Sequence, residues 1–359
     1  MTEPFFNVFC FSNLSLHHLM LFPCPADTET WLSSPDSVII LSYIKTGIAV
    51  PLHVLCTYYI VKKTPGNMQS VKLSLLHFHF WNVVVDLIFN VFSVPISLLP
   101  MPATVLIGLL TTLGLKQTIQ LLILMTSVSF VCLSTTMIFE NRFYLLNSKK
   151  KLWKKCRPFW MFGNILFCLL YQIPIILQVP DVDFVKEFVL NALPCVPEFL
   201  FSTEIVVPTL EETVIIISLT VFIVVVFGQL VAFAAIIIGQ LSSNFGANML
   251  SGSTRRLQKN LLKALIWQTG IPFMYLVLPS CYTTFAFSAD YFNMSNRTEI
   301  TLNNIVVSTA SLHGLVNNLS IILIHQPYRS TVAFWFRKRK TENSRTVNHP
   351  NIFSTNSVF

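Results

Sequence analysis

The chain has 359 residues, of which 53% are hydrophobic and only 11% are charged, and its formal net charge is +8. A soluble domain usually carries about 25% charged residues, so this composition excludes an ordinary water-soluble fold and indicates an integral membrane protein. No Lys or Arg precedes Lys45 and Glu3 stands where a basic signal-peptide region would lie, so the first apolar run is expected to act as its own insertion signal.

Apolar runs divide the chain into seven predicted crossings after an N-terminal segment, 1–37. A helix needs about 20 apolar residues to cross a bilayer. The predicted spans lie near 38–61, 73–99, 117–141, 159–179, 213–239, 261–287 and 300–325. The stretch 73–141 is too long for one crossing and is divided by turn-forming residues, namely Pro95, Pro100, Pro102, Gly108 and Gly114.

Charges alternate between the loops, which predicts the orientation of the chain. Most of the 24 basic residues fall in the loops around 62–72, 142–157 and 255–263 and in the tail after the last span. Most of the 16 acidic residues fall in the remaining loops and in the N-terminal segment. Because Lys and Arg collect in cytoplasmic loops, we expect an all-α membrane protein, a seven-transmembrane helix bundle, with its N-terminus outside the plasma membrane.

The tail, 326–359, is predicted to be cytoplasmic. Pro327 ends or bends the last span, and Val332, Trp335 and Phe336 then share one helical face ahead of four basic residues, Arg337 to Lys340. This pattern favours a short interfacial helix on the inner leaflet, followed by a disordered tail. An ordinary basic stop-transfer flank is the alternative.

Sequons and cysteines mark the predicted outer segments. The glycosylation candidates there are Asn13, Asn293 and Asn296, whereas the sequon at Asn318 lies inside the seventh span and should be unused. Three cysteines are also expected outside, where disulfides persist. We favour a bond between Cys24 and Cys195, which leaves Cys10 unpaired.

Signatures of catalysis are missing from the sequence. It contains no HExxH, G-x-S-x-G or phosphate-binding Walker loop, and no intramembrane acid pair. His77 and His79 are two residues apart and so point to different faces of a helix. We therefore expect no enzyme, no cofactor and no metal site.

Polar residues inside the spans are the stronger functional signal. Asp86 lies in the middle of the second span, where a charge costs roughly 2.5 kcal/mol or more and must face partners. Asn82 and Asn90 lie one turn to either side, and the seventh span offers Asn317, Asn318 and Ser320. This network is either a hydrated switch or a static packing element. Lys45, two turns into the first span, is expected to snorkel outward.

The sixth span carries two prolines. Pro272 and Pro279 each remove a backbone hydrogen bond and predict kinks, and Gln268 lies four residues before the first of them. A kinked sixth helix with a basic inner extension is expected to be able to swing outward. Kinks are also common in static membrane bundles.

Several motifs, in order, resemble one family. The run KKTPGNMQSVKLSLLHFHFWNVVVDL resembles the first inner loop and second helix of nematode serpentine chemoreceptors of class H (Srh). So do LSSPDSVI, FENRFYLL, LPCVPEFL, RLQKNLLKALIWQTGIPF and LIHQPYR, and the similarity runs from about residue 24 to residue 340.

The resemblance implies a G-protein-coupled receptor for small environmental chemicals in sensory cilia. On it, Glu140, Asn141 and Arg142 stand at the Asp/Glu-Arg-Tyr position, and His325 to Arg329 stand at the Asn-Pro-x-x-Tyr region. A ligand between the outer halves of helices three, five, six and seven would displace the inner end of helix six. The crevice so opened would receive a helix of a heterotrimeric G protein and would be ringed by Arg142, Arg255, Arg256, Lys259, Tyr328 and Arg329.

Two other classes of membrane protein fit the sequence less well. A secondary transporter usually shows internal repeats and matching broken helices, and no repeat is evident here. A ligand-gated channel built like a seven-helix odorant receptor would have its N-terminus inside, opposite to the orientation that the charges predict.

Overall fold

We describe the protein from a computed structural model. The described residues are 31–64, 66, 69–99, 101–146, 150–192, 197–242, 252–288, 296–324 and 328–330. The predictions for Asn13, Cys24, Cys195, Asn293 and the interfacial helix after the seventh span lie outside them.

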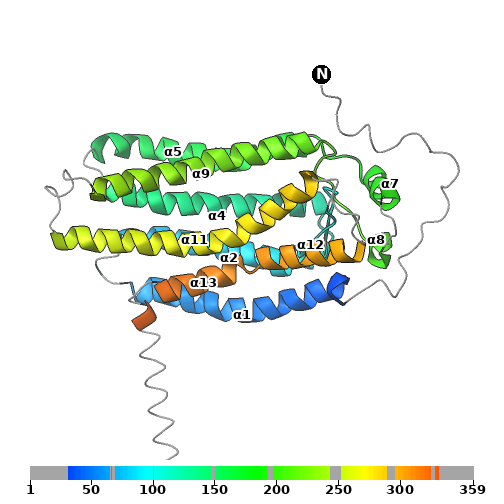
Figure 1. Cartoon of the computed structure of the whole chain (residues 1–359), viewed down its shortest axis with the longest axis horizontal. Helices are drawn as coiled ribbons and strands as arrows, with labels where there is room; N and C mark the ends of the chain where they lie inside the picture. Colours follow the sequence, from blue (N-terminus) through cyan, green and yellow to red (C-terminus); the bar gives the residue numbers. More distant parts are fainter. Residues whose placement is uncertain are drawn as a thin grey trace, which may run out of the picture.

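The long helices run side by side along the longest axis of the molecule (Figure 1). They are α1 (Pro35–Lys62), α2 (Gln69–Leu87), α4 (Gln117–Leu146), α5 (Lys150–Leu170), α9 (Glu212–Ser242), α11 (Gly252–Ser288), α12 (Asn296–Ala310) and α13 (His313–Ile324). The shorter elements are the 3-10 turn η4 (Trp31–Ser33), the π-helical turn η6 (Ile88–Phe92), β1 (Pro95–Ser97), β2 (Thr104–Leu106), α3 (Leu109–Thr112), α6 (Ile173–Ile176), α7 (Val182–Ala192) and α8 (Glu198–Ser202).

These helices make a seven-helix membrane bundle. Among the described residues, six helical segments are long and apolar enough to cross a bilayer, and α12 with α13 form one of them. The remaining long helix, α11, has 37 residues and carries four basic residues in its first third. It lies between α9 and α13 and completes the bundle (Figure 1). The predicted fold class is confirmed.

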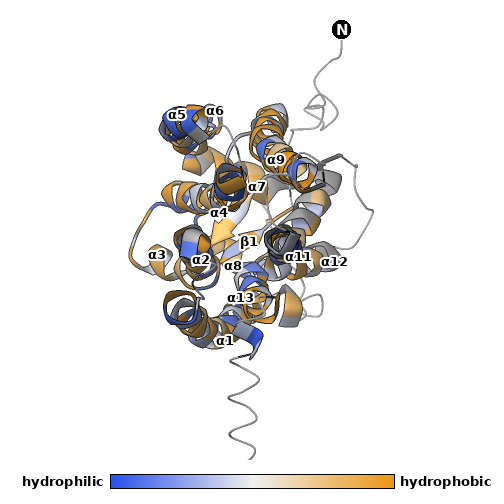
Figure 2. Cartoon of the chain, turned by 90° about the vertical axis from the view of Figure 1, so that its left-hand side faces the viewer, coloured by the Kyte–Doolittle hydropathy of each residue, from blue (hydrophilic) through white to orange (hydrophobic). Residues whose placement is uncertain are grey.

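The flanks of the bundle are apolar and its interior is partly polar, which is the reverse of a soluble protein. Figure 2, a view along the bundle, shows apolar colour over the flanks of the long helices. On α9, Val224 is 65% exposed and Ile217 is 57% exposed, while the buried set includes Asp86 and several asparagines. Burial of polar groups with exposure of aliphatic side chains fits a lipid environment.

Charges are separated between the two ends of the bundle. Figure 1 shows that α11 begins at the same end of the bundle where α1 and α9 finish, and α2 and α5 begin there too. The basic residues of these helix ends include Lys62, Lys63, Lys72, Lys151, Lys154, Lys155, Arg157, Arg256, Lys259 and Lys263. The opposite end holds the acidic helices α7 and α8. We call these the basic end and the acidic end.

A local signal explains where the first pass begins. Ser34 is extended and its hydroxyl oxygen accepts a hydrogen bond from the Asp36 amide at 3.2 Å, while Pro35 occupies the first helical position. Both features are typical of a helix start, and the Asp36 carboxylate is favourable near the positive end of the helix dipole. The sequence LSSPDSVI thus positions α1 at the acidic end.

The acidic end is covered by a small cap that sequence analysis treated only as a turn. Strands β1 and β2 form an antiparallel hairpin, and Thr104 forms a bridge to Val206 from the segment after α8. The pass predicted over 73–99 ceases to be helical after Phe92. A Cβ on Gly108 would lie 2.3 Å from the Phe92 carbonyl oxygen, so only glycine permits this close return of the chain.

The seventh pass is broken, whereas a continuous span was predicted over 300–325. Helix α12 ends at Ala310 and α13 begins at His313. Side-chain hydroxyls compete with the helical hydrogen bonds here: Thr309 donates to the Ile305 carbonyl at 2.8 Å and Ser311 donates to the Ser308 carbonyl at 2.9 Å. Such back-bonding bends helices without proline. The break places Ser311 beside the interior of the bundle.

Candidate functional site

A buried carboxylate occupies the centre of the bundle. Asp86 is 5% exposed, and its Oδ2 lies 2.9 Å from Nε2 of His53 on α1. Asn90 donates through Nδ2 to the Asp86 carboxylate at 3.1 Å and to the Ser311 carbonyl at 3.3 Å. The carboxylate therefore joins α1, α2 and the break in the seventh pass.

His53 extends this network to α13. Asn318 donates from Nδ2 to His53 Nδ1 at 2.9 Å. With Nδ1 accepting, the ring proton lies on Nε2, where it is donated to Asp86. His79 adds a bond from its Nε2 to the His53 carbonyl at 3.2 Å. We call Asp86, His53, Asn90 and Asn318 the core polar network.

Helix α13 approaches the carboxylate closely. A Cβ built on Gly314 would lie 2.7 Å from Cγ of Asp86 and 2.8 Å from its Oδ1. Real Cβ atoms do not come so near, so the glycine lets α13 pack directly against the acid. The seventh pass and Asp86 are fixed to each other by shape as well as by hydrogen bonds.

The structure brings together only part of the network predicted around Asp86. Asn90 and Asn318 belong to it, but Asn82 donates to the Phe78 carbonyl of its own helix at 2.7 Å. Asn317 is fully buried, and neither polar atom of its side chain has a hydrogen-bond partner within the described part of the chain. Sequence reasoning missed His53, although an ionisable residue inside a span was itself a signal.

Lys45 corrects a second expectation. It does not snorkel outward: its ammonium donates to Ser308 Oγ at 3.2 Å and also to Ser311 Oγ. Two hydroxyls offset part of the cost of placing the cation there. Since Asn90 contacts the Ser311 carbonyl, Lys45 is connected to the core polar network through one residue.

At the basic end, Glu140 is committed to α5. It is 1% exposed, its Oε2 lies 2.9 Å from Arg157 Nη2, and its Oε1 accepts from the Trp153 indole at 2.6 Å. Arg157 also lies over the Tyr144 ring, 4.9 Å from its centroid. The sequence pointed to Glu140 but not to its partners, because their pairing depends on how α5 packs against α4.

Arg142 has a different environment two residues further on. Its side chain is 3% exposed, yet Nε and Nη2 have no hydrogen-bond partner among the described residues. Asn141 is 7% exposed and its side-chain oxygen lies 3.5 Å from Arg157 Nη2. The three residues of the Glu-Asn-Arg motif are all buried, and Arg157 contacts both Glu140 and Asn141.

Tyr328 is also buried rather than lining an opening. It is 0% exposed, its hydroxyl lies 2.9 Å from Thr64 Oγ1, and its ring stacks on Tyr59 with centroids 6.1 Å apart. Burial raises the pKa of this phenol above its ordinary value. Tyr328 thus ties the chain beyond the last span back to α1.

Three leucines of α11 close the basic end. Leu262 packs with Phe139 and Phe233, Leu261 packs with Val71, and Leu265 belongs to the cluster of Ile138 and Ile321. We call Leu261, Leu262 and Leu265 the leucine layer. It joins α11 to α2, α4, α9 and α13, so the crevice predicted beside Arg142 is not open here. Arg256, Lys259 and Arg329 are exposed, and nothing is described for the side chain of Arg255.

The remaining predicted residues lie on α11 and α12. Helix α11 runs without interruption through Pro272 and Pro279 and changes direction along its length (Figure 1). Gln268 is 0% exposed. Asn296 is the first residue of α12, and its side chain is not described. Within the described ranges, no group of three or more His, Cys, Asp or Glu residues is arranged to hold a metal ion.

Comparisons with known proteins agree with this architecture. Residues 33–338 match the family described as Serpentine type 7TM GPCR chemoreceptor Srh. The chain is 28% identical over 342 residues to Serpentine receptor class H-72 of Caenorhabditis elegans, covering 92% of this chain and 94% of that protein. A shorter match, 32% identical over 105 residues, links it to Serpentine receptor class r-10 of Caenorhabditis briggsae, covering 28% of this chain and 29% of that one. The expected family is therefore confirmed: the chain belongs to the Srh class of serpentine seven-transmembrane chemoreceptors.

Proposed function

We propose that this chain is a chemosensory receptor that binds a small environmental chemical and signals to a heterotrimeric G protein. Membership of a chemoreceptor family supports the receptor role. The observation that carries the coupling step is at the basic end, where α4 holds the buried Arg142 and the leucine layer packs α11 against its neighbouring helices.

Arg142 makes the closed state costly. A guanidinium presents five donors, and a buried charged group without partners loses hydration that it does not recover. Nε and Nη2 of Arg142 have no hydrogen-bond partner among the described residues. A partner that supplied backbone carbonyls at this point would satisfy them. The C-terminal end of a G-protein helix, with its free carbonyls, has that chemistry.

The leucine layer opposes opening. Removing three buried leucines from apolar contact costs roughly 4.5–9 kcal/mol, at about 1.5–3 kcal/mol each. Moving a two-state equilibrium from 1:99 to 99:1 needs about 5.5 kcal/mol of differential affinity. A ligand and a G protein that both bind the open state more tightly can together supply a differential binding free energy of this size. The layer is therefore strong enough to hold the resting state and weak enough to be displaced.

Displacement of α11 is the proposed movement. The ligand lies between the outer halves of α4, α9, α11 and α12, and it favours a state in which the basic part of α11 swings away. The bend of α11, with Pro272 and Pro279 in its second half, provides the pivot. Arg256 and Lys259 then flank the crevice, and Tyr328 remains as its wall.

The proposed orientation follows from the charges. The basic end faces the cytosol, the acidic end with the N-terminus faces outward at the plasma membrane, and the receptor operates in sensory cilia, with Asn296 as a glycosylation candidate. An epitope at the N-terminus should be stained by antibody on intact cells, whereas one at the C-terminus should require permeabilisation. The reverse pattern contradicts this orientation and would revive the ligand-gated channel alternative.

A second-messenger assay tests the coupling step. Cells expressing the receptor are exposed to a panel of small organic chemicals, and each active compound is tested again on Arg142→Ala, Arg142→Lys and the control Lys116→Ala. Lys116 is exposed at the far end of α4 from Arg142. We expect Arg142→Ala to abolish the response at equal surface expression, Arg142→Lys to keep part of it and Lys116→Ala to leave it unchanged. A full response from Arg142→Ala overturns the assignment.

A further inference from the structure

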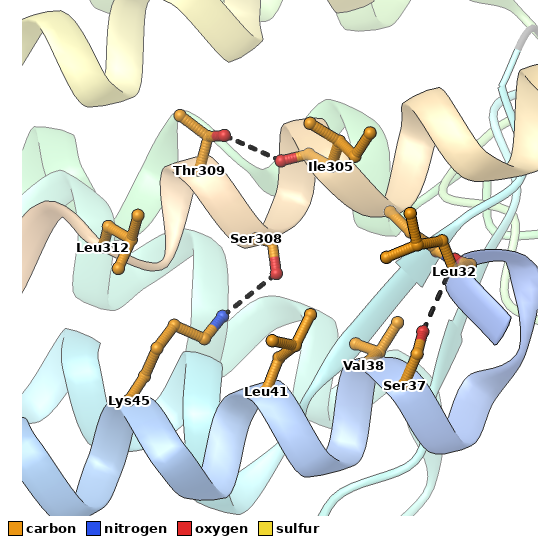
Figure 3. A pocket seen from close by; sticks show the side chains of 10 residues that line it. Leu32, Ser37, Val38, Leu41, Lys45, Ile305, Ser308, Thr309 and Leu312 are labelled. Atoms are coloured by element: carbon orange, nitrogen blue, oxygen red, sulfur yellow. Dashed lines mark hydrogen bonds between the residues drawn. The ribbon is translucent and has the colours of Figure 1, made fainter.

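A cavity of about 290 Å³ lies between α1 and α12 near the acidic end. Figure 3 shows Val38, Leu41 and Lys45 of α1 on one side and Ser308 of α12 pointing toward them, and Ile305 of α12 also lines the cavity. Its walls are almost entirely aliphatic. Polar atoms lie at both ends: the Lys45 ammonium meets the Ser308 hydroxyl at one end, and Ser37 and Asn304 donate to the Leu32 carbonyl at the other.

The cation in this cavity has hydroxyl partners but no anionic one. The salt bridges found among the described residues join His53 with Asp86 and Arg157 with Glu140, and neither includes Lys45. Serine hydroxyls solvate an ammonium but do not neutralise it. Asp86 acts on this ammonium only from a distance, through Asn90 and Ser311. A largely apolar cavity that holds an ammonium without a contacting carboxylate is complementary to a molecule with an anionic head and an aliphatic tail.

We infer that this cavity binds a single-chain organic carboxylate that enters from water. Its two oxygens accept from the Lys45 ammonium and the Ser308 hydroxyl, and its tail lies along Val38, Leu41 and Ile305. At about 30 Å³ for each water-sized group, the cavity holds roughly ten groups. Octanoate, with eight carbons and two oxygens, matches that size.

The site is connected to the centre of the bundle. Lys45 donates to the Ser311 hydroxyl, and the Ser311 carbonyl accepts from Asn90, which holds Asp86. A carboxylate that draws the ammonium toward itself competes with Ser311, the residue at the break of the seventh pass. The signalling consequence of this rearrangement rests on the proposed function, whereas binding itself does not.

Binding is measured on the full chain purified into lipid nanodiscs, by the shift of its thermal unfolding midpoint. Octanoate should raise the midpoint in a saturable way, and the neutral alcohol 1-octanol and the octylammonium cation should do so only at much higher concentration. Lys45→Met should weaken octanoate binding about tenfold or more, because a charge-assisted contact is lost. Lys45→Arg should retain binding, and the exposed Lys116→Met should match the wild type. Equal shifts by octanoate and octanol, or an unchanged affinity in Lys45→Met, overturn the inference.

Two further arms cover misfolding and the source of the ligand. Ser308→Leu fills the cavity but keeps the cation, so it should lose octanoate binding while the unliganded midpoint shows that the protein is folded. Oleate placed in the nanodisc lipid tests a membrane source, and stabilisation by oleate without stabilisation by octanoate contradicts a site loaded from water. One outcome is that octanoate fails to bind while other panel compounds still give a normal response that depends on Arg142. That result rejects this inference and leaves the proposed function standing.

Discussion

His53 and Asp86 form a buried pair across the first two membrane passes, with Nε2 and Oδ2 2.9 Å apart. Each is about 5% exposed, and each has a second partner, Asn318 for the imidazole and Asn90 for the carboxylate. The pair thus fixes α1, α2 and α13 at one depth, at the height where the seventh pass is broken.

Replacing the histidine should destabilise the receptor strongly. His53→Leu leaves the Asp86 carboxylate buried with one remaining side-chain donor, and removal of one partner of a buried pair costs about 3–5 kcal/mol. The thermal unfolding midpoint of this variant in nanodiscs should be clearly lower than that of the wild type. The matched control is His77→Leu on α2, since His77 is exposed and accepts a hydrogen bond from Trp81 of its own helix.

The same pair should be strongly non-additive. Asp86→Asn combined with His53→Leu should cost clearly less than the sum of the two single changes, because no unpaired charge remains. Simple additivity would show that the two side chains are adjacent without depending on each other.

Gly314 offers a test of shape alone. Gly314→Ala places a methyl group 2.7–2.8 Å from three atoms of Asp86, so α13 or the carboxylate must move. We expect lower stability and an altered resting signal. Gly228→Ala on α9 has no heavy atom within 4 Å of the added carbon and should be neutral or stabilising by about 0.5–1 kcal/mol. Equal behaviour of the two alanine variants would refute the close approach of α13.

The Glu140 and Arg157 pair should respond asymmetrically. Glu140 is 1% exposed but Arg157 is 29% exposed, so the arginine can reach water when its partner is lost and the carboxylate cannot. Arg157→Met should therefore destabilise by roughly 2–3 kcal/mol, and Glu140→Gln by about 1 kcal/mol. Chemical or thermal unfolding of the two variants side by side gives the comparison. A larger loss for Glu140→Gln would mean that the acid is not the buried partner.

Weakening the leucine layer should activate the receptor. Leu262→Ala removes apolar contacts that exist only while α11 is closed, so the free energy of the open state falls relative to that of the closed state. A difference of about 1.4 kcal/mol changes the ratio of the two populations tenfold. Basal second-messenger output should rise several-fold at equal surface expression. The control is Leu278→Ala on the same helix, where the side chain is 57% exposed toward the bundle exterior. A silent Leu262→Ala would argue against the layer as the lock.

The fold class could be predicted because lipid imposes simple rules on the sequence. Long apolar runs and alternating basic loops predicted seven passes. The cap was not predictable in the same way: the β1–β2 hairpin depends on a bridge from Thr104 to Val206, about a hundred residues later. The break at Ser311 depends on hydroxyl back-bonding, which leaves no proline or glycine signal.

The candidate site could be predicted only where a residue is costly by itself. Asp86 stands out because a charge inside a span demands partners, and Asn90 follows from helical spacing. His53 could have been found in the same way, as an ionisable residue inside a span. Arg157 and Trp153 are partners supplied by another helix, so their roles depend on packing that one sequence does not reveal. Lys45 shows the same limit, because a side chain expected to point outward instead donates to Ser308 of α12 and to Ser311 at the break of the seventh pass.

The movement of α11 is the central claim, and a distance between two exposed residues at the basic end tests it most directly. Spin labels are placed at Lys154 on α5 and Lys259 on α11, and their separation is measured by pulsed electron paramagnetic resonance in nanodiscs. Adding an active panel compound together with a nucleotide-free G protein should move the distribution to longer distances, and Leu262→Ala should show part of that shift alone. G-protein nucleotide exchange with an unchanged distance would contradict the account.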